Sequence, residues 1–155
     1  MTLEKGDVAE DFELLGNDGR PVTLSSFKGS KNVVLCFYPK NHLFACPSKK
    51  VFEMAKSVIS VYSDIISTTT VLFAISVDSV DSQAEFVKEY EIPYVHLSDP
   101  KKIACKKYAG TNIAGLAKRS TFVIGIDGVI RDVMREINVT SHGQEILDSL
   151  NKINV

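Results

Sequence analysis

The sequence predicts an α/β domain in which a mixed central sheet is covered by helices. Two nearly continuous apolar runs, residues 32–39 and 70–77, are typical of strands buried on both faces. Apolar residues at helical spacing follow these runs, and glycine-containing turn signals near both ends of the chain indicate hairpins. A chain of 155 residues is long enough to bury a core of its own, so we expect a single domain over residues 1–155.

The first half of the chain predicts a hairpin, a strand and a helix. Residues 11–24 hold two short β-prone runs around the turn signal GNDG at residues 16–19, where left-handed backbone costs little. The apolar run 32–39 ends at Pro39, which stops a strand. Apolar side chains then recur at helical spacing through residues 51–65, with polar residues between them, which predicts one amphipathic helix.

The middle of the chain repeats this alternation. The run 70–77 predicts a second buried strand. Ser82 followed by Glu85 resembles a capping box, so we expect a helix from there through Tyr90. Residues 93–99 predict a short third strand.

The last third of the chain predicts a short helix, a hairpin and a closing helix. Residues 99–110 have the composition of a short helix. Residues 120–137 read as two strands joined at Asp127-Gly128, which is a strong hairpin signal. Residues 141–153 complete the pattern with an amphipathic helix.

Charge and hydropathy argue against several classes of function. The formal net charge is −1 and the lysines are spread among acids, so a basic surface for nucleic acid is not expected. The first residues are charged and lack the apolar core of a signal peptide. No apolar run approaches the length that spans a bilayer. We therefore expect a cytoplasmic protein with no nucleic-acid or membrane partner.

The chain has few residues that bind metals or form disulfides: Cys36, Cys46, Cys105, His42, His96 and His142. Their spacing fits neither a disulfide framework nor a zinc site, so no metal or other cofactor is expected. Cys36 lies inside an apolar strand, where a thiol usually serves packing. Cys105 reads either as a packing residue or as a redox partner for another thiol.

Cys46 is the candidate nucleophile. It follows an irregular loop after the strand 32–39 and directly precedes a helix, where unpaired N–H groups and the helix dipole favour a thiolate. The helix end contributes only about 0.3–1 kcal/mol. That is less than one pKa unit, because a unit corresponds to about 1.4 kcal/mol. Strong activation therefore requires a second cation. The alternative is a buried packing residue, but a helix start after a strand-end loop is a poor place for a purely structural thiol.

Four segments in order resemble the peroxiredoxins of the AhpC/TSA superfamily, in the branch of bacterioferritin comigratory protein and peroxiredoxin Q. They are GDVAEDFEL (6–14), VTLSSFKGSKNVVLCFYPK (22–40), ISVDSVDSQAEFVKEYEIPYVHLSDP (75–100) and KRSTFVIGIDGVI (118–130). The first segment carries Glu10 where the family usually has proline. The resemblance covers nearly the whole chain and implies a thioredoxin-like fold with an N-terminal β-hairpin.

The resemblance also implies a mechanism. Cys46 attacks a hydroperoxide and becomes a sulfenic acid, and Arg119 reaches the thiolate from a separate strand and supplies the second cation. The N–H groups of Ala45 and Cys46 donate to the peroxide oxygens, and Pro39 shields the sulfur from water. Read without the resemblance, Arg119 is a solvated residue that precedes a strand.

Leu43 departs from the family pattern. The peroxiredoxin motif places threonine or serine three residues before the nucleophilic cysteine, and this chain has Leu43 there. Leucine neither donates nor accepts a hydrogen bond. The loss of a hydrogen bond to a charged group costs about 1.5–3 kcal/mol, which corresponds to roughly one to two powers of ten in rate. We therefore expect a slow or substrate-shifted peroxidase.

The resolving step lacks an obvious second thiol. The two positions where a resolving cysteine is common in this branch correspond to Val51 and Val87. Cys105 becomes a resolving residue only if its helix unwinds, and Cys36 only if a core strand opens. We favour a one-cysteine cycle in which a small thiol or a thioredoxin-like protein reduces Cys46.

Two other functions stay open. A redox sensor or binding scaffold with weakened peroxidase activity agrees with Leu43 and with the missing resolving thiol. A thiol–disulfide oxidoreductase requires a CxxC pair, but Cys46 is followed by Pro47, Ser48 and Lys49. A monomer and a homodimer are both compatible with the sequence.

Overall fold

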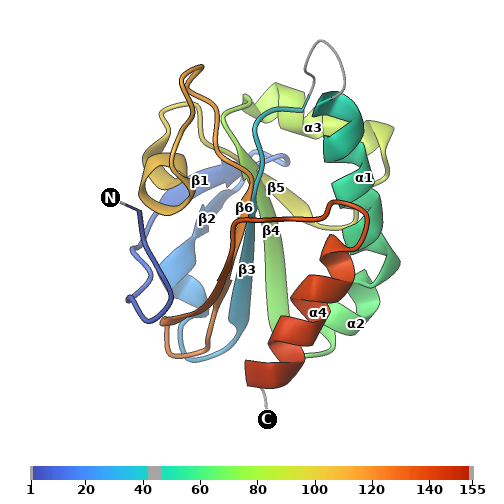
Figure 1. Cartoon of the computed structure of the whole chain (residues 1–155). Helices are drawn as coiled ribbons and strands as arrows, with labels where there is room; N and C mark the ends of the chain where they lie inside the picture. Colours follow the sequence, from blue (N-terminus) through green and yellow to red (C-terminus); the bar gives the residue numbers. More distant parts are fainter. Residues whose placement is uncertain (1, 42–46, 154–155) are drawn as a thin grey trace.

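The protein is a seven-stranded mixed sheet with helices on both faces (Figure 1). A computed structural model describes residues 2–41 and 47–153, without the side chains of residues 47–49. The strands are β1 (Glu13–Gly16), β2 (Pro21–Thr23), β3 (Asn32–Phe37), β4 (Thr70–Ser76), β5 (Val95–Ser98), β6 (Ser120–Ile124) and β7 (Ile130–Met134). The helices are η1 (Leu24–Phe27, a 3₁₀ helix), α1 (Pro47–Ser60), α2 (Tyr62–Ile66), α3 (Val80–Glu89), η2 (Cys105–Ala109, a π-helix) and α4 (His142–Ile153).

The order of the strands is β2-β1-β5-β4-β3-β6-β7. The central strands β3, β4 and β5 are parallel, and helices cross over between them, while the outer strands pair antiparallel. The predicted mixed sheet, N-terminal hairpin and C-terminal hairpin are therefore confirmed. The three parallel strands end at the same edge, where α1 begins, and binding sites of α/β sheets commonly lie at that edge.

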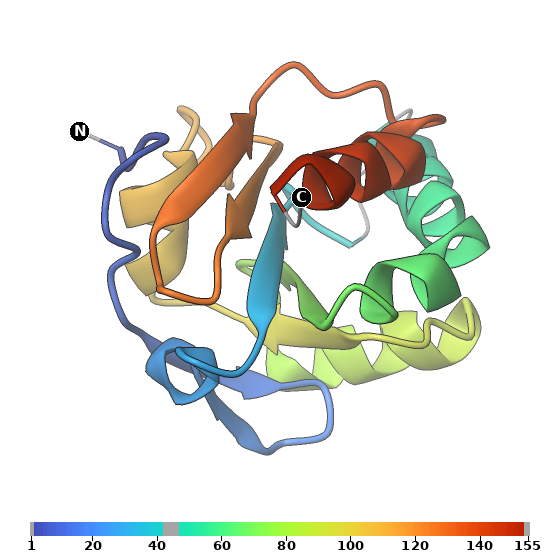
Figure 2. The same cartoon turned by 90° about the horizontal axis from the view of Figure 1, so that it is seen from below.

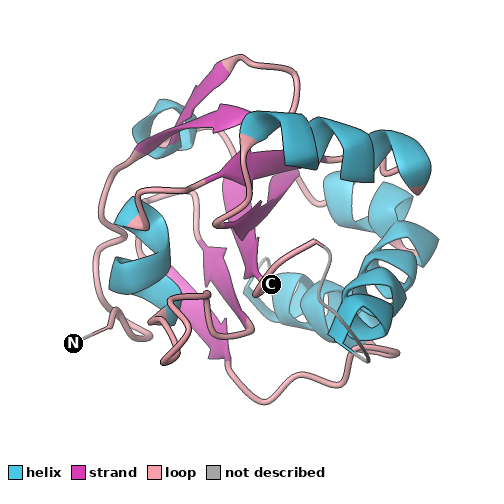
Figure 3. Ribbon diagram, turned by 90° about the horizontal axis from the view of Figure 1, so that it is seen from above, coloured by secondary structure: helices cyan, strands magenta, loops and turns pink. Residues whose placement is uncertain are grey.

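Two apolar clusters sandwich the sheet. The helix-side cluster joins α1, α2, α3 and α4 to one face and includes Cys36 of β3. The opposite cluster holds Leu35 and Phe37 of β3 together with Tyr108 of η2. Figures 2 and 3 show α1, α2 and α4 on one side of the sheet and η2 on the other. All six residues of β3 are buried, as the apolar run predicted, because alternate side chains of this strand enter different clusters.

Three local predictions need correction. The single helix predicted over residues 51–65 is divided into α1 and α2, because Val61 leaves the helical conformation at φ −122° and ψ 12°. The N-cap of α3 is Ser79, not Ser82, since Ser79 is extended and its side chain accepts from the N–H of Ser82. The short helix predicted within residues 99–110 forms as the π-helix η2.

Glycines permit both turns. Gly19 adopts φ +79° in the β1–β2 turn and Gly128 adopts φ +81° between β6 and β7, a region that other residues rarely enter. Within residues 2–41 and 47–153, no helix has the length and apolarity that crossing a membrane requires.

Candidate active site

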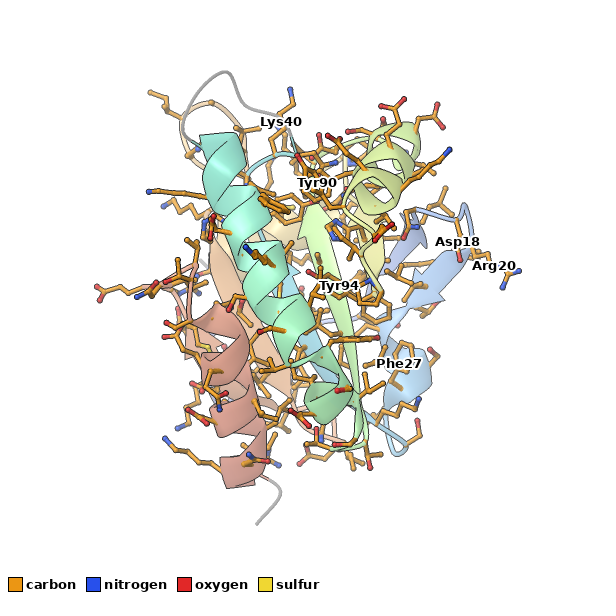
Figure 4. The ribbon with its side chains drawn as sticks, turned by 90° about the vertical axis from the view of Figure 1, so that its right-hand side faces the viewer. Asp18, Arg20, Phe27, Lys40, Tyr90 and Tyr94 are labelled. Carbon is orange, nitrogen blue, oxygen red and sulfur yellow. The ribbon has the colours of Figure 1, made fainter. Side chains whose placement is uncertain are left out.

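The candidate site lies where the chain leaves β3 and enters α1. The chain passes from Phe37 through half-buried Pro39 to Asn41, and α1 begins at Pro47. Figure 4 labels the exposed Lys40 at this end of α1. The predicted nucleophile Cys46, with Leu43 and Ala45, lies outside the described residues.

Arg119 lies at this edge because of strand pairing. It directly precedes β6, and Ser120 at the start of β6 pairs with Phe37 at the end of β3. The antiparallel register thus brings Arg119 next to the end of β3, although the two are far apart in sequence.

The Arg119 side chain is partly buried against α1. Its Nη1 donates to the Sδ atom of Met54 at 3.4 Å. Burial lowers the pKa of Arg119, and the nearby Tyr38 opposes that shift. Arginine nevertheless stays charged in proteins at neutral pH. Read without the family resemblance, the sequence predicts that Arg119 is solvated. In the structure, this side chain is partly buried and packs against α1.

A small, mostly apolar cavity lies beneath α1 beside Arg119. Its lining is formed by Tyr38, Val51, Met54, Ala55, Ala74, Phe86, Tyr94, His96 and Arg119. Tyr94, which directly precedes β5 and is labelled in Figure 4, belongs to this lining and to the helix-side cluster. Arg119 forms part of this mostly apolar lining, and low-dielectric surroundings strengthen the interaction of a cation with an anion.

The other two cysteines are buried on opposite faces of the sheet. Cys36 lies in the helix-side cluster, where burial raises its thiol pKa to about 12. A hydrogen bond with Thr121 opposes this shift only in part. Cys105 lies in the opposite cluster, where burial and the nearby Asp99 raise its thiol pKa. The prediction that Cys36 serves packing is confirmed. Both thiols stay protonated at neutral pH, and η2 holds Cys105 away from α1.

The sequence did not predict a set of buried polar side chains that follow β3 and β4. Asn41, Asp78, Gln83 and His96 are buried close to Tyr38, at the carboxyl edge of the sheet. The signal available in the sequence was a polar Asn41 two residues after the motif residue Pro39. In the part of the chain that the structure describes, no three His, Cys, Asp or Glu side chains group as metal ligands do.

The sheet order and the helix that begins after the central strand β3 define a thioredoxin-like domain. The solved structure of peroxidoxin BcpB from Mycobacterium tuberculosis superimposes with a TM-score of 0.85 at 28% identity, covering 97% of this chain and 98% of that one. The family model described as "AhpC/TSA family" matches residues 5–133.

Curated relatives agree over nearly the whole chain. Peroxiredoxin Bcp of Bacillus subtilis is 32% identical over 158 residues, covering 97% of this chain and 96% of the relative. The chloroplastic peroxiredoxin Q of Sedum lineare is 33% identical over 131 residues, covering 83% of this chain and 67% of the relative. The chain therefore belongs to the AhpC/TSA family, among the peroxiredoxins of the Bcp and Q branch.

Proposed function

We propose that this peroxiredoxin reduces hydrogen peroxide or organic hydroperoxides through Cys46. Peroxiredoxins are thiol peroxidases, so the class of reaction follows from the family, and the proposal concerns the residues and the cycle. The Cys46 thiolate attacks the terminal peroxide oxygen, the O–O bond breaks, and water or an alcohol leaves after protonation. The product is a Cys46 sulfenic acid, and two external thiol equivalents return it to the thiol with release of water.

The position of Arg119 carries this proposal. Its guanidinium is partly buried beside Tyr38 and Met54, at the sheet edge where the chain enters α1. A fixed cation in a low-dielectric wall, together with the helix N-terminus, supplies the activation that the helix end alone lacks. The guanidinium presents several N–H donors, which suits both a thiolate and the two peroxide oxygens. Pro39 and the N–H of Ala45 complete the proposed site.

The burial of the other thiols supports a one-cysteine cycle. Cys36 and Cys105 are both almost fully buried, and their raised pKa values keep them protonated. Val51, at one common resolving position, packs in the helix-side cluster. The reductant is then a small thiol or a thioredoxin-like protein. The cytoplasmic location, and a monomeric or homodimeric state, stay predictions.

Leu43 favours a second candidate function. Without a hydroxyl group at this position, the site lacks one hydrogen bond to the peroxide, which agrees with a redox sensor or scaffold of weakened peroxidase activity. Peroxide turnover separates the two functions, because a sensor or scaffold consumes little peroxide even with excess reductant.

The direct test compares peroxide consumption, with a dithiol reductant, between wild type and Cys46→Ser. We expect Cys46→Ser to abolish consumption, and equal rates would contradict the assignment of the nucleophile. We expect Arg119→Ala to reduce the peroxide rate roughly 10²-fold or more. It also raises the pH at which Cys46 becomes reactive toward alkylation. Arg131→Ala is the matched control, because Arg131 is exposed on the β6–β7 hairpin, where it pairs with Asp127.

Replacement of Leu43 tests the cause of slow turnover. Leu43→Thr restores a hydroxyl group and should raise the second-order rate with hydrogen peroxide by roughly one to two powers of ten. Leu43→Val is the control, since valine has the shape of threonine without the hydroxyl group. The explanation fails if both variants react at the rate of the wild type, or if both gain equally.

A further inference from the structure

Asn41, the last described residue before the segment 42–46, is fixed by hydrogen bonds from its backbone and from both ends of its amide. Its backbone N–H donates to Asp78 Oδ2 at 2.9 Å. Its Nδ2 donates to Gln83 Oε1 at 2.9 Å and to Ser82 Oγ at 3.1 Å, and its Oδ1 accepts from the hydroxyl group of Tyr38. The side chain is 1% exposed. We call these five residues and His96 the loop-base network.

The partners of Asn41 are themselves anchored in three elements of the fold. Gln83 of α3 donates from Nε2 to Ser76 Oγ and to the carbonyl oxygen of Leu97, each at 2.9 Å. Asp78, just after β4, accepts from the hydroxyl group of Ser76. The network therefore joins the end of β3 to β4, β5 and α3. Groups held in this way cannot follow a shift of Asn41 without breaking several buried hydrogen bonds.

The proton inventory of the network is consistent. Burial raises the pKa of Tyr38, so its hydroxyl group stays protonated and donates to the Oδ1 atom of Asn41, which can only accept. Nδ1 of His96 lies 2.8 Å from the same hydroxyl oxygen and donates to it. This requires the neutral Nδ1–H tautomer, in agreement with a pKa lowered by burial to about 3. Gln83 Oε1 accepts from Asn41 Nδ2, and it also lies 3.0 Å from the Tyr38 hydroxyl oxygen, whose single proton points mainly to Asn41.

Asn41 also delimits a short stretch of chain. Residues 42–46 connect it to α1, whose first residue is Pro47. α1 is held by the packing of Val51, Met54, Ala55 and Val58 against the sheet. Because the connection is only five residues long, the positions of Asn41 and Pro47 limit where any residue between them can lie. A displacement of about 1 Å in a reacting group can cost 10²-fold in rate.

We propose that Asn41 is a positioning residue for peroxide reduction: through the loop-base network it holds the start of the segment that carries Cys46 in register with Arg119. This inference rests on the proposed function. Asn41 does not touch the peroxide, and its effect reaches the reaction through the placement of Cys46. The network thus supplies preorganisation rather than charge.

The experiment measures two rates on the same thiol at a pH where Cys46 is fully ionised. One is oxidation of Cys46 by hydrogen peroxide in a single turnover, and the other is alkylation by a small neutral electrophile. Alkylation needs only an exposed thiolate, whereas peroxide reduction needs the sulfur aligned with the donors. We expect Asn41→Ala to lower the peroxide rate 10-fold to 100-fold, while the alkylation rate changes less than about threefold.

Three further variants keep the test independent of folding losses. Tyr38→Phe removes only the hydroxyl group that donates to Asn41, and we expect a smaller loss in the same direction. The double variant Tyr38→Phe/Asn41→Ala should lose little more than Asn41→Ala, because both changes break the same network. Ser149→Ala, which removes a hydrogen bond to Asp132 far from the site, should keep the wild-type peroxide rate.

The outcomes separate this inference from the proposed function. One outcome is that Cys46→Ser is inactive, while folded Asn41→Ala and Tyr38→Phe react with peroxide as fast as the wild type. That result overturns only the positioning role of Asn41. A parallel fall of the peroxide and alkylation rates also overturns it, since that indicates lost access or lost structure. Peroxide consumption that persists in Cys46→Ser overturns the proposed function instead.

Discussion

Arg119 donates a hydrogen bond to a thioether, which is an acceptor that carries no charge of its own. The Sδ atom of Met54 is a weak, uncharged acceptor, so it orients the guanidinium without neutralising it. Among the side chains that the structure describes, no carboxylate forms an ion pair with Arg119. A carboxylate in the same place would compete with the Cys46 thiolate for the cation.

Met54→Leu tests this contact. Leucine keeps the volume but removes the acceptor, so the guanidinium is less well oriented and we expect the peroxide rate to fall about 2-fold to 10-fold. The free energy of unfolding should change by less than about 1.5 kcal/mol, as is usual for volume-conserving core changes. The measurements are single-turnover oxidation and denaturant unfolding. Met134→Leu on β7 is the matched control, and an equal effect of both substitutions on the rate would argue against a role for the sulfur contact.

At the scale of elements, the contact of α4 with α1 depends on a glycine. Gly143 lies in the first turn of α4, and its N–H donates to Ser57 Oγ at 2.9 Å. A Cβ atom there would lie 2.2 Å from the carbonyl oxygen of Ser57 and 2.8 Å from Cγ2 of Val61. The absence of a side chain therefore sets how closely the two helices approach.

Gly143→Ala should destabilise the protein even though alanine favours helices. The gain in helix propensity is about 1 kcal/mol, but the clash with the backbone of α1 forces the helices apart and costs more. We expect a net loss of about 1–3 kcal/mol in the free energy of unfolding, measured by urea denaturation. Gln144→Ala, at an exposed position of the same helix, should be nearly neutral. A stability of Gly143→Ala equal to or above that of the wild type would contradict the close packing.

At the scale of the whole molecule, buried histidines determine how stability depends on pH. His96 lies among the rings of Tyr38, Phe86 and Tyr94, and burial lowers its pKa from 6.5 to about 3. His142 is also buried, and its pKa is lowered for the same reason. Folding therefore disfavours the protonated form of both rings relative to the unfolded chain.

The stability contributed by neutral His96 is complete above pH 6.5 and is lost as the pH falls from 6.5 toward about 3. In that window the unfolded chain binds a proton at this ring and the folded protein does not. At pH 5 this amounts to about 2 kcal/mol, since each pH unit below 6.5 costs about 1.4 kcal/mol. The measurement is the free energy of unfolding at pH 7.5 and pH 5. His96→Gln should show a smaller loss between the two values, and Ser149→Ala the full loss. Equal losses in the wild type and His96→Gln would refute the role of His96.

Much of the fold was predictable because its signals are local. The run 32–39 is apolar at every position up to its proline except for Asn32, and this pattern identified the central strand β3. The turns at Gly19 and Gly128 were likewise visible, since few residues other than glycine adopt their backbone conformation. The break at Val61 and the π-helical form of residues 105–109 escaped prediction, because packing against the sheet decides them and periodicity does not.

The sequence by itself determined the order of strands and helices, the kinds of reactive side chain and the family, since each of these is written in neighbouring residues or in short motifs. Only the tertiary structure decided that Arg119 lies beside Met54, that Cys36 and Cys105 face opposite sides of the sheet, and that Asn41 is tied to α3. These relations join residues far apart in the chain. They follow from strand register and side-chain packing, which are properties of the folded molecule as a whole.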